Sequence, residues 1–298
     1  MHKKHSLAGL LAGLAAASIW GGMYVVSKVV LEVIPPFALL TSRLVLGSAA
    51  LGLVILWQRT FFSKQNSATP SGTLWPAFWV GLVGYGVSLG FQFVGTKLST
   101  ASNGALVTSA TPAFVLLFAA LLLRERITPR RLLALVVASL GVLAVIDPRS
   151  AQLDSGLFWG NLSLLAAALT WALYSVLVRK VSRNADLIRS TAVMLIGGLP
   201  ITLPWGAWEI STQGMGVITP GVVGGVLFLG IISTAIAMFL WNYAFAELPA
   251  GVASLTFFAQ PVVGTLLGWL FLGETITPLF ILGGVLIGAG LLVANSDR

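Results

Sequence analysis

Continuous apolar runs of about 20 residues recur along almost the whole chain, and they limit its fold more than any other feature. A helix of that length crosses a hydrocarbon layer roughly 30 Å thick. The strands of a membrane β-barrel would instead alternate apolar and polar residues over roughly 10 positions. Only 9% of the residues are charged, which is far below the usual share in soluble domains. The sequence therefore predicts an all-α polytopic membrane protein.

Turn signals divide the chain into ten expected transmembrane helices. The Thr-Pro pairs at 128–129 and 277–278 are typical of an N-cap followed by proline at the first helical position. The amino-terminal run resembles a signal peptide but continues past Ser18, which predicts a retained first helix. The longest expected loop, residues 58–73, is polar. The expected helices span residues 6–31, 36–57, 74–95, 100–123, 129–147, 156–178, 187–208, 219–244, 250–272 and 278–295.

The basic residues of the loops predict the orientation. With a cytoplasmic amino terminus, 13 of the 17 Lys and Arg residues fall in cytoplasmic segments, three fall outside, and Arg43 lies within a span. This bias predicts both termini in the cytoplasm and, for a bacterium, a location in the inner membrane. It also accounts for the net charge of +8 without a nucleic-acid partner. The expected partners are a small-molecule substrate and the lipid bilayer, and the expected assembly is a monomer or a weak homodimer.

The two halves of the chain are related by a shift of 149 residues. The shift aligns residues 112–146 with 261–295 without a gap and gives 12 identities in 35 positions. The most specific pairs are Pro112/Pro261, Glu125/Glu274, Thr128/Thr277, Pro129/Pro278 and Gly141/Gly290. A repeat unit of five spans is odd in number, so the second copy enters the membrane in the opposite orientation. The sequence thus predicts two inverted five-helix repeats, residues 1–147 and 148–298, that form one unit.

Inverted halves favour transport by alternating access, because exchanging their shapes converts an inward-open state into an outward-open one. A channel is the main alternative, but the sequence has no filter motif or ring of charges. A membrane enzyme or scaffold is a further alternative. The sequence lacks a P-loop and the common hydrolase motifs, so we expect neither an ATP-driven pump nor an enzyme. It has no cysteine, and we expect no cofactor.

The whole chain resembles the drug/metabolite transporter superfamily, EamA-like branch. The resemblance lies in the ten spans, the five-plus-five repeat, Trp20 in the first span and an arginine in the second. A "GE-x-x-T" pattern also closes the fourth and ninth spans. It is intact in the second copy as Gly273, Glu274 and Thr277, whereas the first copy keeps Glu125 and Thr128 but has Arg124 in place of the glycine. The resemblance implies movement of small metabolites, often export of amino acids and related compounds.

Candidate binding residues are polar or aromatic side chains at mid-depth in the expected spans. Pro112 and Pro261 are candidate hinges, because each removes a backbone donor and either frees a carbonyl for a ligand or kinks its helix. Trp and Tyr near span ends are instead expected in the interfacial belt, as for Trp57, Trp75, Trp205 and Trp208. The expected substrate-binding residues are Trp20, Tyr24, Tyr85, Asn103, Thr108, Trp171, Tyr174, Trp241, Phe257 and Gln260.

Arg43 is the one strong charge within an expected span, roughly two turns from its outer end. Three roles are open to it. The side chain can extend to the outer interface, pair with Glu32, or bind a substrate carboxylate. The sequence alone leaves all three open.

No Asp, Glu or His lies at mid-depth in any expected span. Proton coupling needs a titratable group there, so we expect facilitated transport or exchange. An aromatic, mildly polar cavity suits aromatic or other apolar amino acids, and export of these is the expected function. Import of a vitamin or nucleobase-like metabolite, or drug export, is the alternative.

Overall fold

The computed structural model describes residues 6–61, 74–99, 107–108, 110–146, 157–182, 186–272 and 278–295. These residues form helices and no strand. The first half contains α1 (Leu7–Leu31), α2 (Pro36–Phe61), α3 (Trp75–Gly81), the π-helical segment η1 (Leu82–Ser88), α4 (Leu89–Leu98), α6 (Thr111–Leu123) and α7 (Pro129–Ile146). The second contains α8 (Phe158–Ser182), α9 (Leu187–Gln213), α10 (Pro220–Leu227), the π-helical segment η4 (Phe228–Ile236), α11 (Ala237–Glu247), α12 (Ala250–Leu255), the 3-10 turn η5 (Thr256–Phe258), α13 (Ala259–Leu272) and α14 (Pro278–Asn295).

The prediction of an all-helical membrane protein is confirmed. Five helical stretches of the described residues are long and apolar enough to cross a bilayer, and shorter apolar helices accompany them. The five are Pro36–Thr60, Trp75–Leu98, Phe158–Ser182, Leu187–Gln213 and Pro220–Glu247. The third span is the run α3–η1–α4, the eighth is α10–η4–α11, and the ninth is α12–η5–α13.

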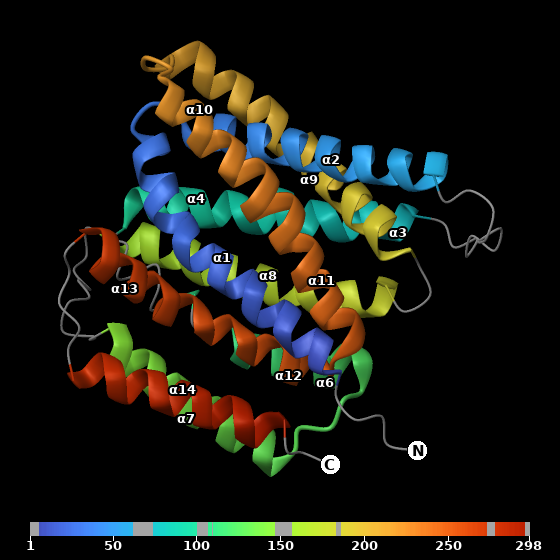
Figure 1. Ribbon diagram of the computed structural model, residues 1–298, viewed down its shortest axis with the longest axis vertical. Coiled ribbons are helices and arrows are strands. Elements are labelled where there is room, and N and C mark those ends of the chain that lie inside the picture. The colour runs from blue at the N-terminus through green and yellow to red at the C-terminus, as the bar shows by residue number, and fades with distance from the viewer. Residues whose placement is uncertain are drawn as a thin grey trace.

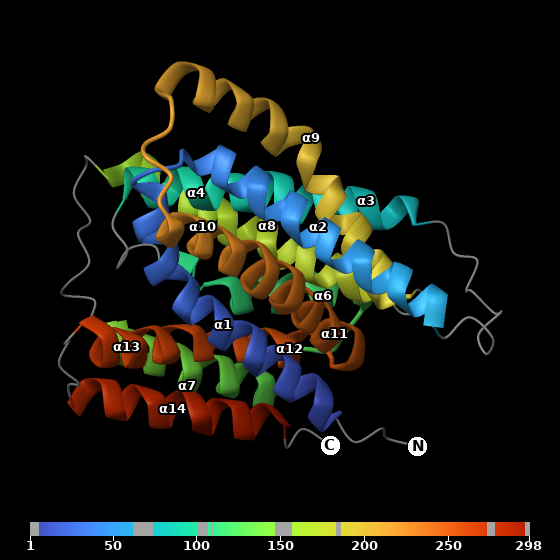
Figure 2. The same cartoon turned by 45° about the horizontal axis from the view of Figure 1, so that its top comes forward.

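The helices pack as a bundle in which α2 and α9 lie at one side and α7 and α14 at the other (Figures 1 and 2). Helices α1, α8, α11 and α13 lie between these two pairs. The start of α1 and the end of α14 lie at the same end of the bundle in both views, where α6 finishes.

The main helix pairs are preserved when the two halves of the chain are exchanged. Helix α1 packs against α11 and α13, and its counterpart α8 packs against α4 and α6. The remaining two pairs, α2 with α9 and α7 with α14, each join a helix to its own counterpart. Gly141 and Gly290 are equivalent in the repeat, and each abuts backbone of the opposite helix of the α7–α14 pair.

Glycines allow α3 and α9 to approach backbone to backbone. A Cβ atom added to Gly81 would lie 1.9 Å from the carbonyl oxygen of Met194, and one added to Gly197 would lie 2.1 Å from that of Phe78. Small residues serve this purpose in membrane helices, where close van der Waals packing drives association. The α3–α9 contact therefore has no room for even one methyl group at these two positions.

The structure corrects three details of the sequence prediction. Helix α2 continues to Phe61, so its last turn occupies the first part of the predicted loop. Helix α6 begins at Thr111, so Pro112 lies in its first turn, where a missing N–H is tolerated, and not within a continuous helix. The third and eighth spans contain π-helical segments, η1 and η4, that the hydrophobic pattern did not predict.

Arg124 ends α6 in the left-handed conformation, with φ 56°. The N–H groups of Arg124 and Glu125 both donate to the carbonyl of Ala119, which satisfies a carbonyl at the helix end. The left-handed conformation favours glycine, and glycine is the residue that the "GE-x-x-T" pattern has at this position. The substitution affects a helix end and not the interior of the bundle.

Glu209 of α9 caps the amino terminus of α2. Its Oε2 accepts hydrogen bonds from the N–H groups of Phe37 at 2.6 Å and Ala38 at 3.1 Å. A carboxylate there also interacts favourably with the helix dipole. We expect Glu209→Gln to lower the free energy of unfolding by about 1 kcal/mol, measured by thermal unfolding in detergent. Glu247→Gln is the control, because Glu247 is exposed; an equal loss in both variants would contradict the capping role.

Candidate functional site

A cavity lies between the halves, toward the end of the bundle opposite the start of α1. It reaches Leu31, the last residue of α1, Thr96 near the end of α4, and Thr108 ahead of α6. It encloses about 750 Å³ of space between protein atoms, its mouth included. The lining residues are Trp20, Met23, Ser27, Leu31, Arg43, Ser88, Leu89, Gln92, Phe93, Thr96, Thr108, Thr111, Ala167, Ala168, Trp171, Met238, Phe257 and Gln260.

Aromatic rings form one wall of this cavity. The ring centroid of Trp20 lies 5.7 Å from that of Trp171 and 6.4 Å from that of Phe257, in edge-to-face arrangements. The indole N–H of Trp20 donates to the carbonyl of Ser233 at 3.0 Å, which holds this ring in place. Trp20 and Trp171 occupy matching positions in the two halves of the sequence and both line the cavity.

Tyr85, Tyr174 and Trp241 form a buried layer next to the aromatic wall and do not line the cavity. The ring centroids of Trp171 and Tyr174 are 4.8 Å apart. The Tyr174 hydroxyl donates to Oδ1 of Asn242 at 2.6 Å, so it accepts the hydrogen bond that joins it to the Tyr85 hydroxyl. The buried hydroxyl and amide groups satisfy one another's hydrogen bonds, and this network fixes the positions of the Tyr85 and Tyr174 rings.

Arg43 lies at the cavity wall with only 1% of its surface exposed. Its Nε donates to Oγ1 of Thr234 at 3.1 Å, and one terminal nitrogen donates to Oγ of Ser233 at 3.3 Å. The guanidinium carbon lies 5.9 Å from the ring centroid of Phe93. Arg43 thus does not extend to the outer interface, which excludes the first of its three predicted roles.

The π-helical segment η4 positions the partners of Arg43. The Thr234 hydroxyl donates to the carbonyl of Leu229, five residues earlier, at 2.7 Å, and so leaves its oxygen free to accept from Arg43. The side chain of the neighbouring Ser233 contacts Arg43 while its carbonyl accepts from Trp20. The wider turn of a π-helix, common at functional sites, lets two consecutive residues serve this one region.

Three buried polar atoms of the cavity residues have no hydrogen-bond partner in the described part of the chain. They are Nε1 of Trp171, Oε1 of Gln260 and Oγ of Ser27. A buried polar atom without a partner is costly, so such atoms next to a cavity are candidates for contact with a ligand or water. The wall therefore offers a donor, an acceptor and a hydroxyl besides Arg43.

The remaining predicted residues are placed as follows. Thr108, Phe257 and Gln260 line the cavity. Pro261 lies within α13, just after the 3-10 turn η5, and Pro112 lies in the first turn of α6; neither lines the cavity. Asn103 and the side chain of Tyr24 lie outside the described residues.

Several lining residues were missed by the sequence analysis, chiefly Met23, Ser27, Gln92 and Thr96. Gln92 carried a usable signal, because it is an amide within an expected span. Trp57, Trp75, Trp205 and Trp208, expected in the interfacial belt, are exposed on the bundle surface.

Comparison with known proteins identifies the family. The family model described as "EamA-like transporter family" matches residues 7–146 and 158–296. The uncharacterized transporter YoaV of Bacillus subtilis (strain 168) is 27% identical over 284 residues, which cover 95% of each chain. Protein PecM of Dickeya dadantii (strain 3937) is also 27% identical over 284 residues, 94% of this chain and 90% of that protein.

A crystal structure shares the fold, with a TM-score of 0.79, 23% identity and coverage of 96% of each chain. The family match covers both halves of the bundle, and the relatives that match the whole chain include named transporters. The protein is therefore a membrane transporter and not an enzyme, and the chain belongs to the EamA-like transporter family.

Proposed function

We propose that this transporter exports aromatic or other apolar amino acids by alternating access. The observation that carries the proposal is the cavity that combines the aromatic wall of Trp20, Trp171 and Phe257 with the buried guanidinium of Arg43. An aromatic wall binds an apolar side chain by stacking, and a guanidinium binds a carboxylate through two parallel hydrogen bonds. Amphiphiles with both features are the substrates that such a cavity favours.

Residues 1–147 and 148–298 are, in this proposal, two inverted repeats of one transport unit. The family model matches once within each half, and the main helix pairs are preserved when the halves are exchanged. The excess of Lys and Arg in alternate loops supports cytoplasmic termini in a bacterial inner membrane. The cavity then lies at the outer end of the bundle, and the unit works as a monomer or weak homodimer.

The proposed driving force is the gradient of the substrate itself, through facilitated transport or exchange. The described lining residues of the cavity include no Asp, Glu or His. A wall without a titratable acid has no group that could take up and release a proton during the cycle.

Flux into proteoliposomes tests this function. We expect radiolabelled tryptophan or phenylalanine to move down its own gradient at equal pH on both sides, and protein-free liposomes to show none. An absolute requirement for a pH gradient would contradict the driving force. Absence of flux for every aromatic and branched amino acid would contradict the substrate.

Substitution of the cavity tryptophans tests the binding site. We expect Trp171→Ala and Trp20→Ala each to weaken substrate binding about tenfold, because each removes a ring from the aromatic wall. Binding can be measured by the substrate-dependent rise in thermal stability. Trp208→Ala is the control, since Trp208 is exposed and lies outside the cavity. Wild-type affinity in both cavity variants would rule out this wall as the substrate site.

A further inference from the structure

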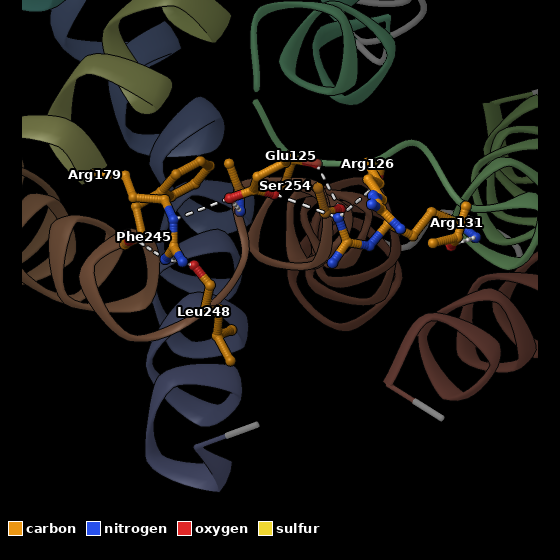
Figure 3. Close-up of polar contacts among 10 residues, drawn as sticks. Glu125, Arg126, Arg131, Arg179, Phe245, Leu248 and Ser254 are labelled. Carbon is orange, nitrogen blue, oxygen red and sulfur yellow. Dashed lines mark hydrogen bonds and ion pairs between the residues drawn. The ribbon is translucent and has the colours of Figure 1, made fainter. Parts of the chain in front are cut away.

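A second cluster of charged groups lies at the end of the bundle opposite the cavity mouth. Its centre is Glu125, which directly follows the left-handed cap of α6 and is 16% exposed at its side chain. Figure 3 shows that the carboxylate is flanked by Arg179 of α8 on one side and Arg131 of α7 on the other. None of these residues lines the cavity.

The two carboxylate oxygens of Glu125 have different partners. Oε1 lies 3.0 Å from Nε of Arg179 and accepts a hydrogen bond from the N–H of Ala250 at 3.1 Å. Oε2 lies 3.4 Å from a terminal nitrogen of Arg131. Arg179 in turn donates to the carbonyls of Phe245 and Leu248 (Figure 3). Glu125 thus takes part in two ion pairs, and the pair with Arg179 is supplemented by three hydrogen bonds to the backbone.

These bonds fix the short turn between α11 and α12. The carbonyls that accept from Arg179 are those at the carboxyl end of α11, and the N–H that donates to Glu125 is at the amino end of α12. A cation at a helix carboxyl end and an anion at a helix amino end both interact favourably with the helix dipoles. The Glu125–Arg179 pair therefore joins the first half of the chain to this turn of the second half.

We propose that the Glu125–Arg179 pair is the latch that holds this end of the transporter closed while the cavity is open at the other end. For the opposite state to form, the α11–α12 turn must separate from the end of α6, and that movement breaks the pair and its backbone hydrogen bonds. A contact that is made in only one of two states sets their relative populations. The inference rests on the alternating access of the proposed function and not on its substrate.

The sequence repeat has a basic residue and a glutamate at equivalent positions in both halves. Lys28 follows Trp20 by eight positions as Arg179 follows Trp171, and Glu274 is aligned with Glu125. Both halves of the sequence therefore have a basic residue in the first helix and a glutamate after the fourth helix. Such recurrence is expected of residues that serve the transport cycle and not one local turn.

Thiol labelling tests the latch directly, because the chain contains no cysteine. Ser254→Cys places one thiol on α12 near the latch, where the wild-type side chain is fully buried, and Thr96→Cys places one at the cavity. Each is combined with Glu125→Gln, and the rate of reaction with a small polar maleimide is measured in detergent without substrate. We expect the rate at position 254 to rise roughly tenfold or more, since a minor state populated at about 10% or less becomes dominant. The rate at position 96 falls.

Two further variants make the result decisive. Glu247→Gln removes an exposed carboxylate from the same end of the bundle and leaves both rates unchanged. Arg179→Lys keeps the charge but loses the guanidinium geometry, and gives a smaller change in the same directions; it decides the test if the Glu125→Gln protein does not fold. Unchanged rates in the folded variants overturn the latch, and so does a rise at both positions, which indicates general loosening. An incorrect assignment of the substrate would affect only the flux assay, because the labelling rates are measured without substrate.

Discussion

Replacing Arg43 with methionine is expected to weaken binding of an amino-acid substrate by roughly 10- to 100-fold. A hydrogen bond to a charged group contributes about 1.5–3 kcal/mol, and each 1.4 kcal/mol is about a tenfold change in affinity. Because Arg43 is buried at the cavity wall, little water is available to substitute for it there. Methionine fills similar volume without charge, so the aromatic wall keeps its support from this side.

A substrate analogue without the carboxylate distinguishes direct binding by Arg43 from a structural role of Arg43. The amine that lacks the carboxylate, for example tryptamine in place of tryptophan, should bind the Arg43→Met protein and the wild type with equal affinity. Arg59→Met is the control, because Arg59 is exposed at the end of α2. If the variant loses affinity for tryptophan and tryptamine alike, Arg43 supports the wall and does not bind the carboxylate.

Gly81→Ala is expected to cause the largest loss of stability among single-methyl substitutions in the described bundle. The added Cβ would lie 1.9 Å from the carbonyl oxygen of Met194, and backbone cannot move aside as a side chain can. Forcing extra atoms into a packed interior typically costs about 1–3 kcal/mol and sometimes more. We expect a clear fall in the midpoint of thermal unfolding in detergent, followed by the fluorescence of the ten tryptophans.

Gly224→Ala is the matched control, because nothing lies within 4 Å of a Cβ atom at that position of α10. Alanine in a helix is intrinsically about 1 kcal/mol more favourable than glycine, so this control should be as stable as the wild type or slightly more stable. Equal midpoints for the two variants would show that α3 and α9 can separate at little cost.

The ten expected helices could be predicted because the thickness of the hydrocarbon layer sets the length of each apolar run. Details that depend on neighbouring helices could not. Pro112 is compatible with a kink or with a helix start, and packing decides in favour of the start at Thr111. The π-helical turn η4 is accompanied by the hydrogen bond of the Thr234 hydroxyl to the Leu229 carbonyl, a feature to which a hydrophobic pattern is insensitive.

The sequence indicated which types of residue would form the candidate site, but not which of them would face the cavity. Trp171 and Tyr174 lie one turn apart on α8, yet only Trp171 lines the cavity. In a span that is apolar on all sides, the sequence does not indicate how far each polar residue lies from the axis of the bundle. Arg43 illustrates the same limit, because its partners Ser233 and Thr234 are about 190 positions away in the chain.

The α7–α14 pair stands apart from the cavity. These helices pack mainly on each other, their small core adds Leu255, Phe258 and Val262 from the ninth span, and neither helix contributes a lining residue. Selection for a particular solute therefore acts on the spans that line the cavity and not on the lipid-facing surfaces of this pair. Among relatives that carry different solutes, amino-acid replacements on those surfaces should accumulate independently of specificity.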